Sequence, residues 1–320
     1  MPIVEPSNYR APWWMPGGHL QTIAPALWRK PRTVTTERER LELEDGDFLD
    51  LDWRREGRDK LAILSHGLEG SSRALYIQAM ADALWQEDWD VLAWNCRSCS
   101  GEMNRLPRFY HSGVSDDLKQ VVGHALAVHP AQQVDLVGFS LGGNLTLKLL
   151  GELGADLPVR LHRAVTFSVP CDLAASSRRL ETWLNRKLYM RRFIQPLLKK
   201  VEKKRIAHPG MPDVDPRLSL ETFKQFDDRF TAPLHGFRDA EDYWEQSSSL
   251  PLLSEIRLPT LLVQAANDPF LAGGCYPYAE ARESENFCLE VTHGGGHIGF
   301  GSPWHHRNWA ESRVLEFLGS

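Results

Sequence analysis

The fold of this chain is decided by one stretch of sequence, VDLVGFSLGG at residues 134–143. Residues 134–139 are apolar, partly β-branched and bounded by polar or small residues, so they predict a short buried strand. From Leu141 onward leucines recur on the spacing of a helix. The stretch therefore predicts a strand that turns abruptly into a helix.

The turn itself has the pattern Gly138-x-Ser140-x-Gly142. A side chain two positions before or after the serine would collide with the neighbouring strand or helix, and glycine removes that collision. The serine takes a strained backbone, and its hydroxyl stands exposed at the end of the strand. A pattern this short also occurs in ordinary turns, so it needs further residues to indicate chemistry.

Strands alternate with helices along most of the chain. Apolar runs predict strands at residues 41–44, 48–53, 61–65, 91–94, 164–169, 260–265 and 287–291. The Asp45-Gly46 dipeptide between the first two runs is a hairpin signal, so an antiparallel pair opens the sheet. The later alternation predicts an α/β fold with a mostly parallel central sheet and helices on both faces.

Three segments are expected along the chain. The predicted core comprises residues 37–173 and 250–320, and a strand-free helical pattern predicts a cap inserted at residues 174–249. Residues 1–36 are rich in Pro, Trp and Gly, which predicts an arm packed on the core. Within that arm GGHLQT, residues 17–22, predicts a turn leading into a short helix, and nothing in its composition indicates chemistry.

The first half of the predicted cap is strongly basic. Residues 174–205 contain eleven Lys or Arg against two Glu, and apolar residues follow a helical stripe through them. In one interpretation the stripe packs on the core and the charges face water. In the other, part of the basic face meets an anionic lipid surface. Residues 220–249 are far more acidic, so pairing between the two halves also accounts for some of the excess.

Composition excludes several classes of protein. The net charge of −5 over 320 residues gives no reason to expect a nucleic-acid partner. Residues 1–6 have the wrong composition for a secretory signal, and no apolar run is long enough to span a bilayer. Five scattered cysteines favour a reducing compartment over a disulfide framework, so a cytoplasmic protein is expected.

A serine hydroxyl needs a base and an acid before it becomes a nucleophile. The base must contact the hydroxyl, and the acid must fix the tautomer of the base. Around a strand-to-helix elbow these partners follow the serine in the order acid, then histidine. Asp268 directly follows the predicted strand 260–265, and His297 lies in a glycine-rich loop after the next strand. We therefore predict Ser140 as nucleophile, His297 as base and Asp268 as its orienting acid.

Other residues compete for each role. Asp239 and Asp242 lie in the predicted cap and follow no strand, which makes them weaker acids. His293 lies nearer the strand end than His297, but the glycines between them favour the later residue as the one that reaches the elbow. His305 and His306 are expected at the start of a helix.

Metal and cofactor chemistry is not predicted. Cys96-x-x-Cys99 has the spacing of a zinc or redox motif, but the chain contains no second such pair. His293 and His297 have a zinc-like spacing that requires a helix, and the three glycines between them favour a loop. No Lys-Ser/Thr follows those glycines, so they do not form a phosphate-binding loop.

The negative oxygen that forms during acyl transfer needs preorganised donors. The backbone N–H of Leu141, at the start of the elbow helix, is one candidate. The N–H of Leu68, in the first strand-to-helix loop after His66-Gly67, is the other.

Five segments form a recognisable set: GGHLQT (17–22), HGLEG (66–70), RSCSGE (97–102), YHSG (110–113) and Asp116-Asp117. With them the chain resembles, from Gly17 to the last helix, one branch of the α/β-hydrolase superfamily. That branch contains the YheT-like bacterial esterases and the eukaryotic medium-chain ester hydrolases and acyltransferases. Ser98 departs from the pattern, since glycine is expected after the arginine, and this bears on the local shape of that loop.

The resemblance implies Ser140, Asp268 and His297 as catalytic triad and an activity on acyl esters. Together with the apolar cap, it predicts a serine carboxylic ester hydrolase acting on short- to medium-chain acyl esters or lipids without a cofactor. An alcohol acyltransferase or an acylglycerol lipase using the same site is the alternative. A non-catalytic lipid-binding protein on the same fold is a further class, and the complete order of serine, acid and histidine disfavours it.

Overall fold

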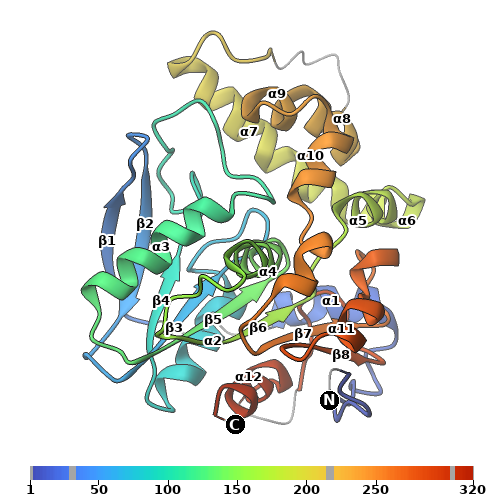
Figure 1. Ribbon diagram of the computed structural model, residues 1–320. Helices are drawn as coiled ribbons and strands as arrows, with labels where there is room; N and C mark the ends of the chain where they lie inside the picture. The colour runs from blue at the N-terminus through green and yellow to red at the C-terminus, as the bar shows by residue number, and fades with distance from the viewer. Residues whose placement is uncertain (1–2, 29–33, 214–219, 303–306, 320) are drawn as a thin grey trace.

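A single eight-stranded sheet forms the centre of the computed structural model, which describes residues 3–28, 34–213, 220–302 and 307–319 (Figure 1). Its strands lie in the order β1-β2-β4-β3-β5-β6-β7-β8. Strand β2 pairs antiparallel with β1 and β4, and the remaining neighbours pair parallel. The strands are β1 (Glu37–Glu42), β2 (Phe48–Arg54), β3 (Lys60–Ser65), β4 (Asp90–Trp94), β5 (Gln133–Phe139), β6 (Leu161–Phe167), β7 (Thr260–Ala265) and β8 (Phe287–Thr292). The predicted α/β class and mostly parallel sheet are confirmed.

The first strand differs from its prediction. It was expected at residues 41–44, but β1 spans Glu37–Glu42 and the turn begins at Leu43. The sequence of β1 is ERERLE, and its arginines pair with the carboxylates of β2, Arg38 with Asp52 and Arg40 with Asp50. Because this edge strand is held by ion pairs and is largely exposed, apolar periodicity does not reveal it.

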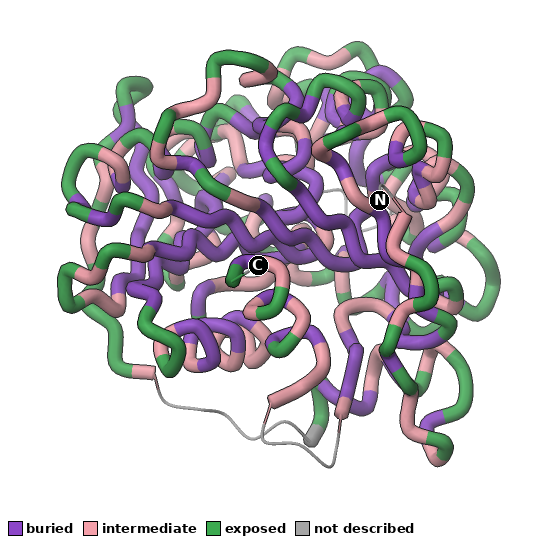
Figure 2. Tube along the Cα trace, turned by 60° about the horizontal axis from the view of Figure 1, so that its bottom comes forward, coloured by how far each residue is buried: buried purple, intermediate pink, exposed green. Residues whose placement is uncertain are grey.

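Helices cover both faces of the sheet. Helices α2 (Leu75–Trp85) and α12 (Trp309–Gly319) contact each other and pack on one face, where they share an apolar cluster with Ala62 and Leu64 of β3. Helices α3 (Ser115–Val128), α4 (Leu141–Leu153) and α11 (Tyr278–Glu283) contribute to the cluster on the other face, which includes Leu61 and Ile63. Successive residues of β3 thus point to opposite faces, and Figure 2 shows the strands as the buried layer between the helices.

A group of helices between β6 and β7 lies beyond the carboxyl ends of the parallel strands, with α7 to α10 at the top of Figure 1 and α5 and α6 at its right. They are α5 (Leu173–Leu180), α6 (Trp183–Asn185), η1 (Arg186–Met190), α7 (Arg191–Ala207), α8 (Phe223–Phe226), η2 (Asp227–Thr231), α9 (Ala232–His235) and α10 (Ala240–Ser247), and the η3 turn (Leu250–Glu255) leads back to β7. We refer to residues 173–247 as the cap. Its apolar cluster, which includes Ile194 and Phe230, also takes in Phe270 after β7.

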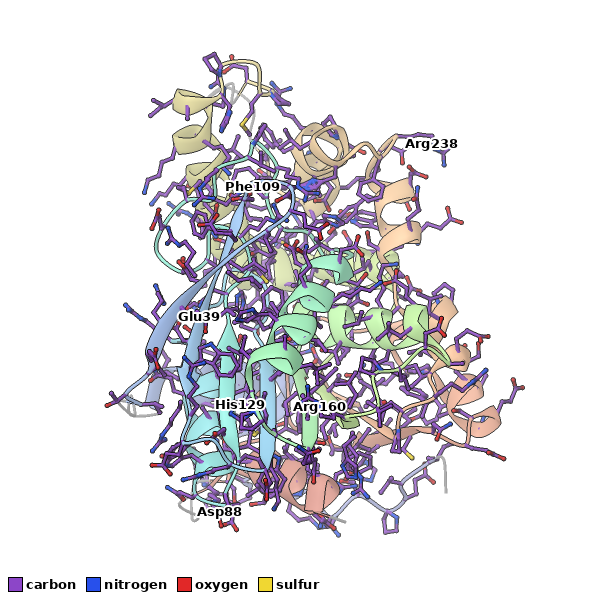
Figure 3. The ribbon with its side chains drawn as sticks, turned by 60° about the vertical axis from the view of Figure 1, so that its left-hand side comes forward. Glu39, Asp88, Phe109, His129, Arg160 and Arg238 are labelled. Atoms are coloured by element: carbon purple, nitrogen blue, oxygen red, sulfur yellow. The ribbon has the colours of Figure 1, made fainter. Side chains whose placement is uncertain are left out.

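The loop between β4 and α3 rises from the sheet to meet the cap. Its Phe109 lies beneath α7, with the Lys204 ammonium 4.8 Å from the ring centroid, whereas Arg238 extends away from the cap surface (Figure 3). Phe109 also packs against the apolar cluster of the cap, so this loop and the cap are in contact above the strand ends.

The N-terminal residues run along the edge of the sheet formed by β8, at the other end of the sheet from β1. Ile3 forms a parallel bridge to Leu289 of β8, and Tyr9 is buried against Phe300. Trp13 has 88% of its surface exposed, so aromatic residues in this arm are not all packed on the core. The GGHLQT segment begins helix α1 (Gly17–Trp28), which is longer than the short helix expected.

Candidate active site

The predicted elbow is present at the carboxyl end of β5. Ser140 has φ +51° and ψ −119°, in the strained region, and it immediately precedes α4. A Cβ added to Gly138 would lie 2.7 Å from the carbonyl oxygen of Gly142, and one added to Gly142 would lie 2.4 Å from the carbonyl oxygen of Ser65 on β3. Both glycines are therefore required by the close approach of strand and helix, as the sequence predicts.

Two hydrogen bonds connect three residues from separate parts of the chain. Nε2 of His297 lies 2.9 Å from Oγ of Ser140, and Nδ1 of His297 lies 2.9 Å from Oδ2 of Asp268. An ionised carboxylate only accepts, so it holds the imidazole proton on Nδ1 and leaves Nε2 free to accept from the serine hydroxyl. The second oxygen of Asp268 accepts from the N–H of Phe270 at 2.8 Å, which fixes the carboxylate.

The competing residues lie elsewhere. His293 is exposed to solvent, four residues before the ring that contacts the serine. Asp239 and Asp242 belong to α10, where Asp239 accepts from the first turn of the helix and Asp242 pairs with Arg238. His305 and His306 lie outside the described residues.

The loop that carries His297 is held by helix α1. The N–H of His297 donates to Oγ1 of Thr22 at 2.9 Å, and Oε1 of Gln21 accepts from the N–H of Gly295 at 2.7 Å and from Asn267 at 3.0 Å. Gly296 fits because a Cβ there would lie 2.6 Å from the carbonyl oxygen of Gly18. Sequence reasoning assigned no chemical role to this segment, and its membership in the family pattern was the one signal that pointed to it.

The two residues that carry the predicted donors line the same cavity as Ser140. The N–H groups of Leu68 and Leu141 make no hydrogen bond to another described residue, and both residues line the cavity beside His297. Leu141 is the first residue of α4, where an unpaired N–H is expected. Glycine at position 67 lets this loop approach Ser140 closely, since a Cβ there would lie 3.3 Å from Cβ of Ser140. The arrangement is suited to hold a negatively charged oxygen next to the serine.

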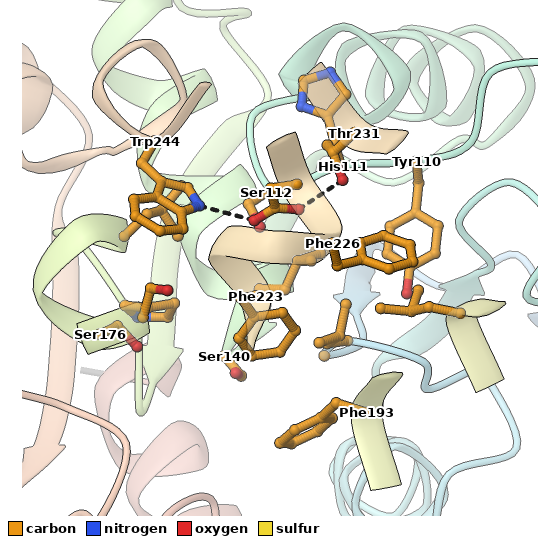
Figure 4. A pocket seen from close by; sticks show the side chains of 18 of the residues that line it. Tyr110, His111, Ser112, Ser140, Ser176, Phe193, Phe223, Phe226, Thr231 and Trp244 are labelled. Atoms are coloured by element: carbon orange, nitrogen blue, oxygen red, sulfur yellow. Dashed lines mark hydrogen bonds between the residues drawn. The ribbon is translucent and has the colours of Figure 1, made fainter. Parts of the chain in front are cut away.

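The cavity above Ser140 has a volume of about 250 Å³ and is lined mainly by apolar side chains of the cap. Leu197 and Phe270, which lies in the loop after β7, line it together with Phe193 and Phe223, and the last two are labelled in Figure 4. The ring of Phe270 also contacts that of His297, with centroids 4.2 Å apart and the planes tilted by 38°. This site therefore places a hydrogen-bonded serine hydroxyl beside a largely apolar cavity.

One ionisable group in the chamber wall is buried. The carboxylate of Asp227 accepts from the hydroxyl of Thr231 at 2.6 Å and from the indole N–H of Trp244 at 2.9 Å (Figure 4). Burial raises the pKa of Asp227 to about 7 against these stabilising hydrogen bonds. Asp227 therefore changes charge near neutral pH inside the cap.

Substituting Asp227→Asn should stabilise the protein more at pH 8 than at pH 5. Because the pKa of Asp227 is raised in the folded state, stability falls as the pH rises from about 4 to 7, and asparagine removes this loss. We expect the difference in unfolding free energy between variant and wild type to grow by roughly 2–4 kcal/mol between pH 5 and pH 8. Urea unfolding at the two pH values measures it.

The neighbouring residue provides the control. Lys224 and the N–H of Ala240 bind Asp228, and although burial acts the other way they lower its pKa. Asp228→Asn should therefore lose a little stability at both pH values. Equal responses of the two variants to pH would contradict the assignment of the raised pKa to Asp227.

The cysteines of the Cys96-x-x-Cys99 segment are poorly suited to thiol exchange. Burial raises the pKa of the Cys99 thiol to about 11 and that of Cys96 well above its ordinary value. Thiol exchange requires the thiolate, which is therefore scarce at neutral pH. No cluster of three His, Cys, Asp or Glu side chains with metal-binding geometry occurs among the described residues.

The RSCSGE segment instead builds a buried ion-pair network. Arg97 donates two hydrogen bonds to Asp117 at 2.7 and 2.8 Å, and further ones to Asp45 at 2.8 Å and Asp47 at 2.9 Å. Ser98, where glycine was expected, does adopt a positive φ of +65°, and its hydroxyl bonds to Asn104 at 2.5 Å. The loop therefore takes the conformation that glycine would favour.

Comparisons with known proteins agree with this geometry. A family model described as the alpha/beta hydrolase fold matches residues 62–302. The Escherichia coli (strain K12) protein named "Putative esterase YheT" is 36% identical over 316 residues, covering 94% of this chain and 89% of its own. The human protein Phospholipase ABHD3 is 29% identical over 308 residues, covering 93% of this chain and 75% of its own.

A solved structure shows the same fold. The Pyrococcus furiosus esterase PF2001 matches with a TM-score of 0.59 at 18% identity, over 90% of this chain and 91% of that one. With the elbow, the mostly parallel sheet and the family match over most of the chain, the protein is a member of the α/β-hydrolase family, in the branch that contains YheT, and is a hydrolase of that family.

Proposed function

We propose that the protein is a serine carboxylic ester hydrolase that cleaves short- to medium-chain acyl esters through a covalent acyl-enzyme. Ser140 is the nucleophile, His297 the general base and Asp268 the residue that orients it. The observation that carries this proposal is the continuous pair of 2.9 Å hydrogen bonds from Asp268 through His297 to Ser140, at the floor of an apolar cavity. The names of the relatives, an esterase and a phospholipase, support ester hydrolysis.

The reaction follows from the positions of the protons. Nε2 of His297 takes the hydroxyl proton as Oγ of Ser140 attacks the ester carbonyl carbon, and the carboxylate of Asp268 stabilises the imidazolium. The N–H groups of Leu68 and Leu141 donate to the carbonyl oxygen as it becomes negative. His297 then protonates the departing alcohol oxygen. Water, deprotonated by the same nitrogen, releases the acid from Ser140.

The cavity supports an acyl group of limited length. Ligand pockets usually have volumes of about 300–1,000 Å³, and this one, at about 250 Å³, lies just below that range. Its apolar side chains contact hydrocarbon favourably, at roughly 25 cal/mol for each Å² removed from water. These features favour a short to medium chain over a long one.

A panel of p-nitrophenyl esters graded by acyl length tests the proposal. We expect kcat/KM to rise with length, pass through a maximum and fall once the chain exceeds the cavity. Leu197→Phe narrows the cavity and should move the maximum to a shorter chain. Ile206→Phe makes the same kind of change on the exposed end of the same helix, at a residue 85% exposed, and should leave the maximum unchanged. A flat profile for all three proteins would contradict an acyl-binding role for the cavity.

The product identifies the class of reaction. A hydrolase forms the free acid when ethanol is added, whereas an alcohol acyltransferase forms the ethyl ester. Including a monoacylglycerol in the panel tests the acylglycerol lipase alternative, because such an enzyme should prefer the glycerol ester over the p-nitrophenyl ester of the same acid.

We also propose that the cap contacts an anionic lipid surface. Only part of the apolar stripe predicted in the cap is buried, as at Ile194 and Val201. At its other end Trp183 is 74% exposed, and Leu184 and Leu188 are also exposed. The surrounding cations Arg179, Lys187, Arg191 and Arg192 are exposed and form no ion pair with another described residue. The pairs Arg178–Glu241 and Arg186–Glu221 account for only part of the local charge.

Exposed tryptophan and leucine among unpaired cations is typical of a surface that enters the membrane interface. No described helix is both long and apolar enough to traverse a bilayer, so contact would be peripheral. The protein should sediment with vesicles containing phosphatidylglycerol, and Trp183→Ser with Arg191→Glu should abolish this. Val159→Ser with Lys119→Glu alters an apolar and a basic residue exposed elsewhere and should sediment like wild type. Equal sedimentation of the two double variants would contradict the proposal.

A further inference from the structure

The loop that carries Leu68 is attached to the cap through a small network of polar side chains. Nζ of Lys200, on α7, donates to Oε1 of Glu69 at 2.7 Å. The hydroxyl of Tyr110 donates to the same oxygen at 2.8 Å and accepts from the backbone N–H of Glu69, also at 2.8 Å. We call Lys200, Glu69 and Tyr110 the Glu69 bridge.

The bridge is shielded from solvent. The side chains of Lys200 and Glu69 retain only 18% and 11% of their exposure, and Tyr110 is buried. An ion pair in such a place is screened little by water and salt, and removing one partner leaves the other charge without compensation. The bridge therefore differs from the exposed ion pairs of the cap surface, such as Lys224–Asp228.

Glu69 occupies a backbone position that needs support. Its φ is +54°, a left-handed conformation that is strained for a residue other than glycine. It directly follows Leu68, which lines the cavity and whose N–H makes no hydrogen bond to another described residue. On the other side of Leu68, the N–H of Gly67 donates to the Tyr76 hydroxyl at 2.8 Å. The carbonyl of Gly67, in the same peptide group as the Leu68 N–H, also accepts from the N–H of Gly70 at 3.0 Å and lies 2.7 Å from Nδ1 of His66. Core contacts therefore hold the loop before Leu68, and the Glu69 bridge adds the contact from the cap after it.

The same face of α7 also contacts the acyl chamber. Phe193, Leu197 and Lys200 are spaced by four and three residues, which places them on one side of the helix, and all three line the cavity. A chain bound against Phe193 and Leu197 therefore touches the helix whose ammonium holds the donor loop.

We propose that the Glu69 bridge positions the Leu68 N–H, so that the donor site for the oxyanion is complete only when α7 of the cap is docked. Lys200, Glu69 and Tyr110 are positioning residues in this scheme and do not touch the reacting atoms. The inference rests on the proposed ester hydrolysis at Ser140. It implies that acyl groups long enough to contact α7 raise kcat as well as lowering KM, because they stabilise the docked cap.

Lys200→Met tests the bridge while keeping the length and apolar stem of the side chain. Losing an entire oxyanion donor costs about 10²–10³ in kcat, so loosening one should cost about 10- to 100-fold. We expect that loss in kcat with KM changed by less than about threefold, and we expect Lys200→Arg to restore most of the rate. Lys199→Met is the matched control, because Lys199 is the exposed neighbour on the same helix.

A second variant removes the contact that the loop between β4 and α3 makes with Glu69. Tyr110→Phe removes the hydroxyl that ties the Glu69 backbone to its own side chain and leaves the cap unaltered, so it should also lower kcat more than it raises KM. In the Lys200→Met/Tyr110→Phe double variant the losses should be less than multiplicative, since both act on the position of one N–H. Thermal unfolding of each variant shows whether it remains folded.

The outcomes separate the bridge from the proposed function. Wild-type kcat in both folded single variants, or a rise in KM alone, would overturn the positioning role while leaving hydrolysis at Ser140 intact. Hydrolysis that survives in Ser140→Ala would instead overturn the proposed function. A selective loss of kcat, rescued by arginine and absent from Lys199→Met, supports the bridge.

Discussion

Replacing Ser140 with alanine should lower kcat for ester hydrolysis by a factor on the order of 10⁴ to 10⁶. The alanine methyl group fits where the serine side chain lies, so the cavity and the two N–H donors remain. What disappears is the oxygen that lies 2.9 Å from Nε2 of His297. The residual rate reflects substrate binding and stabilisation of the oxyanion alone. Steady-state hydrolysis of the preferred p-nitrophenyl ester measures the loss.

Substituting the other two members of the proposed triad should also lower kcat, and by different factors. Asp268→Asn keeps the shape but favours the wrong imidazole tautomer, and a loss of about 10⁴ is expected. His297→Gln should be as damaging as the serine variant, because the three residues act as a unit. His293→Gln is the matched control, since His293 is exposed. A fluorophosphonate probe should label wild type and His293→Gln but not Ser140→Ala, and labelling of Ser140→Ala would place the nucleophile elsewhere.

Substituting Arg97→Met should lower the free energy of unfolding by about 3–5 kcal/mol, with Tm reduced by roughly 5–10 °C. Arg97 is 2% exposed and forms ion pairs with Asp45, Asp47 and Asp117, and Asp45 also pairs with Arg108. Methionine fills similar space but leaves three carboxylates close together. Although burial opposes it, hydrogen bonding and the Arg97 charge hold the pKa of Asp47 below its ordinary value in the native protein.

The pH dependence of the Arg97 variant distinguishes lost charge compensation from lost packing. Protonation of the carboxylates relieves their repulsion, so the deficit should shrink as the pH falls toward 4. Arg178→Met removes an exposed arginine paired with Glu241 and should change stability by less than about 1 kcal/mol. An Arg97→Met protein as stable as wild type at pH 7 would show that the network is dispensable.

The candidate site was largely predictable because its chemistry imposes local sequence constraints. The elbow needs small residues at 138 and 142, and each predicted partner follows a strand recognisable by its apolar run. Their role in catalysis stays a prediction, but the structure does bring Ser140, His297 and Asp268 together. The glycine loop before His297 also distinguished it from His293, which lies in solvent.

Contacts made by polar side chains from distant segments were less predictable. Gln21 and Thr22 hold the His297 loop, but hydrogen bonds to backbone groups some 270 residues away leave no periodic trace in the sequence. Strand β1 was displaced in the prediction for a similar reason, since arginine–aspartate pairs rather than apolar burial hold it to β2.

By itself, the sequence determined the fold class, the order of strands and helices, and the elbow at Ser140, because steric limits and apolar periodicity act between near neighbours. Only the tertiary structure decided which cap residues face the cavity, that Trp183 and Leu188 face solvent, and that Lys200 reaches Glu69. Those features depend on how the cap docks above the strand ends. Docking is set by many weak contacts between segments far apart in the chain, and no single stretch of sequence encodes it.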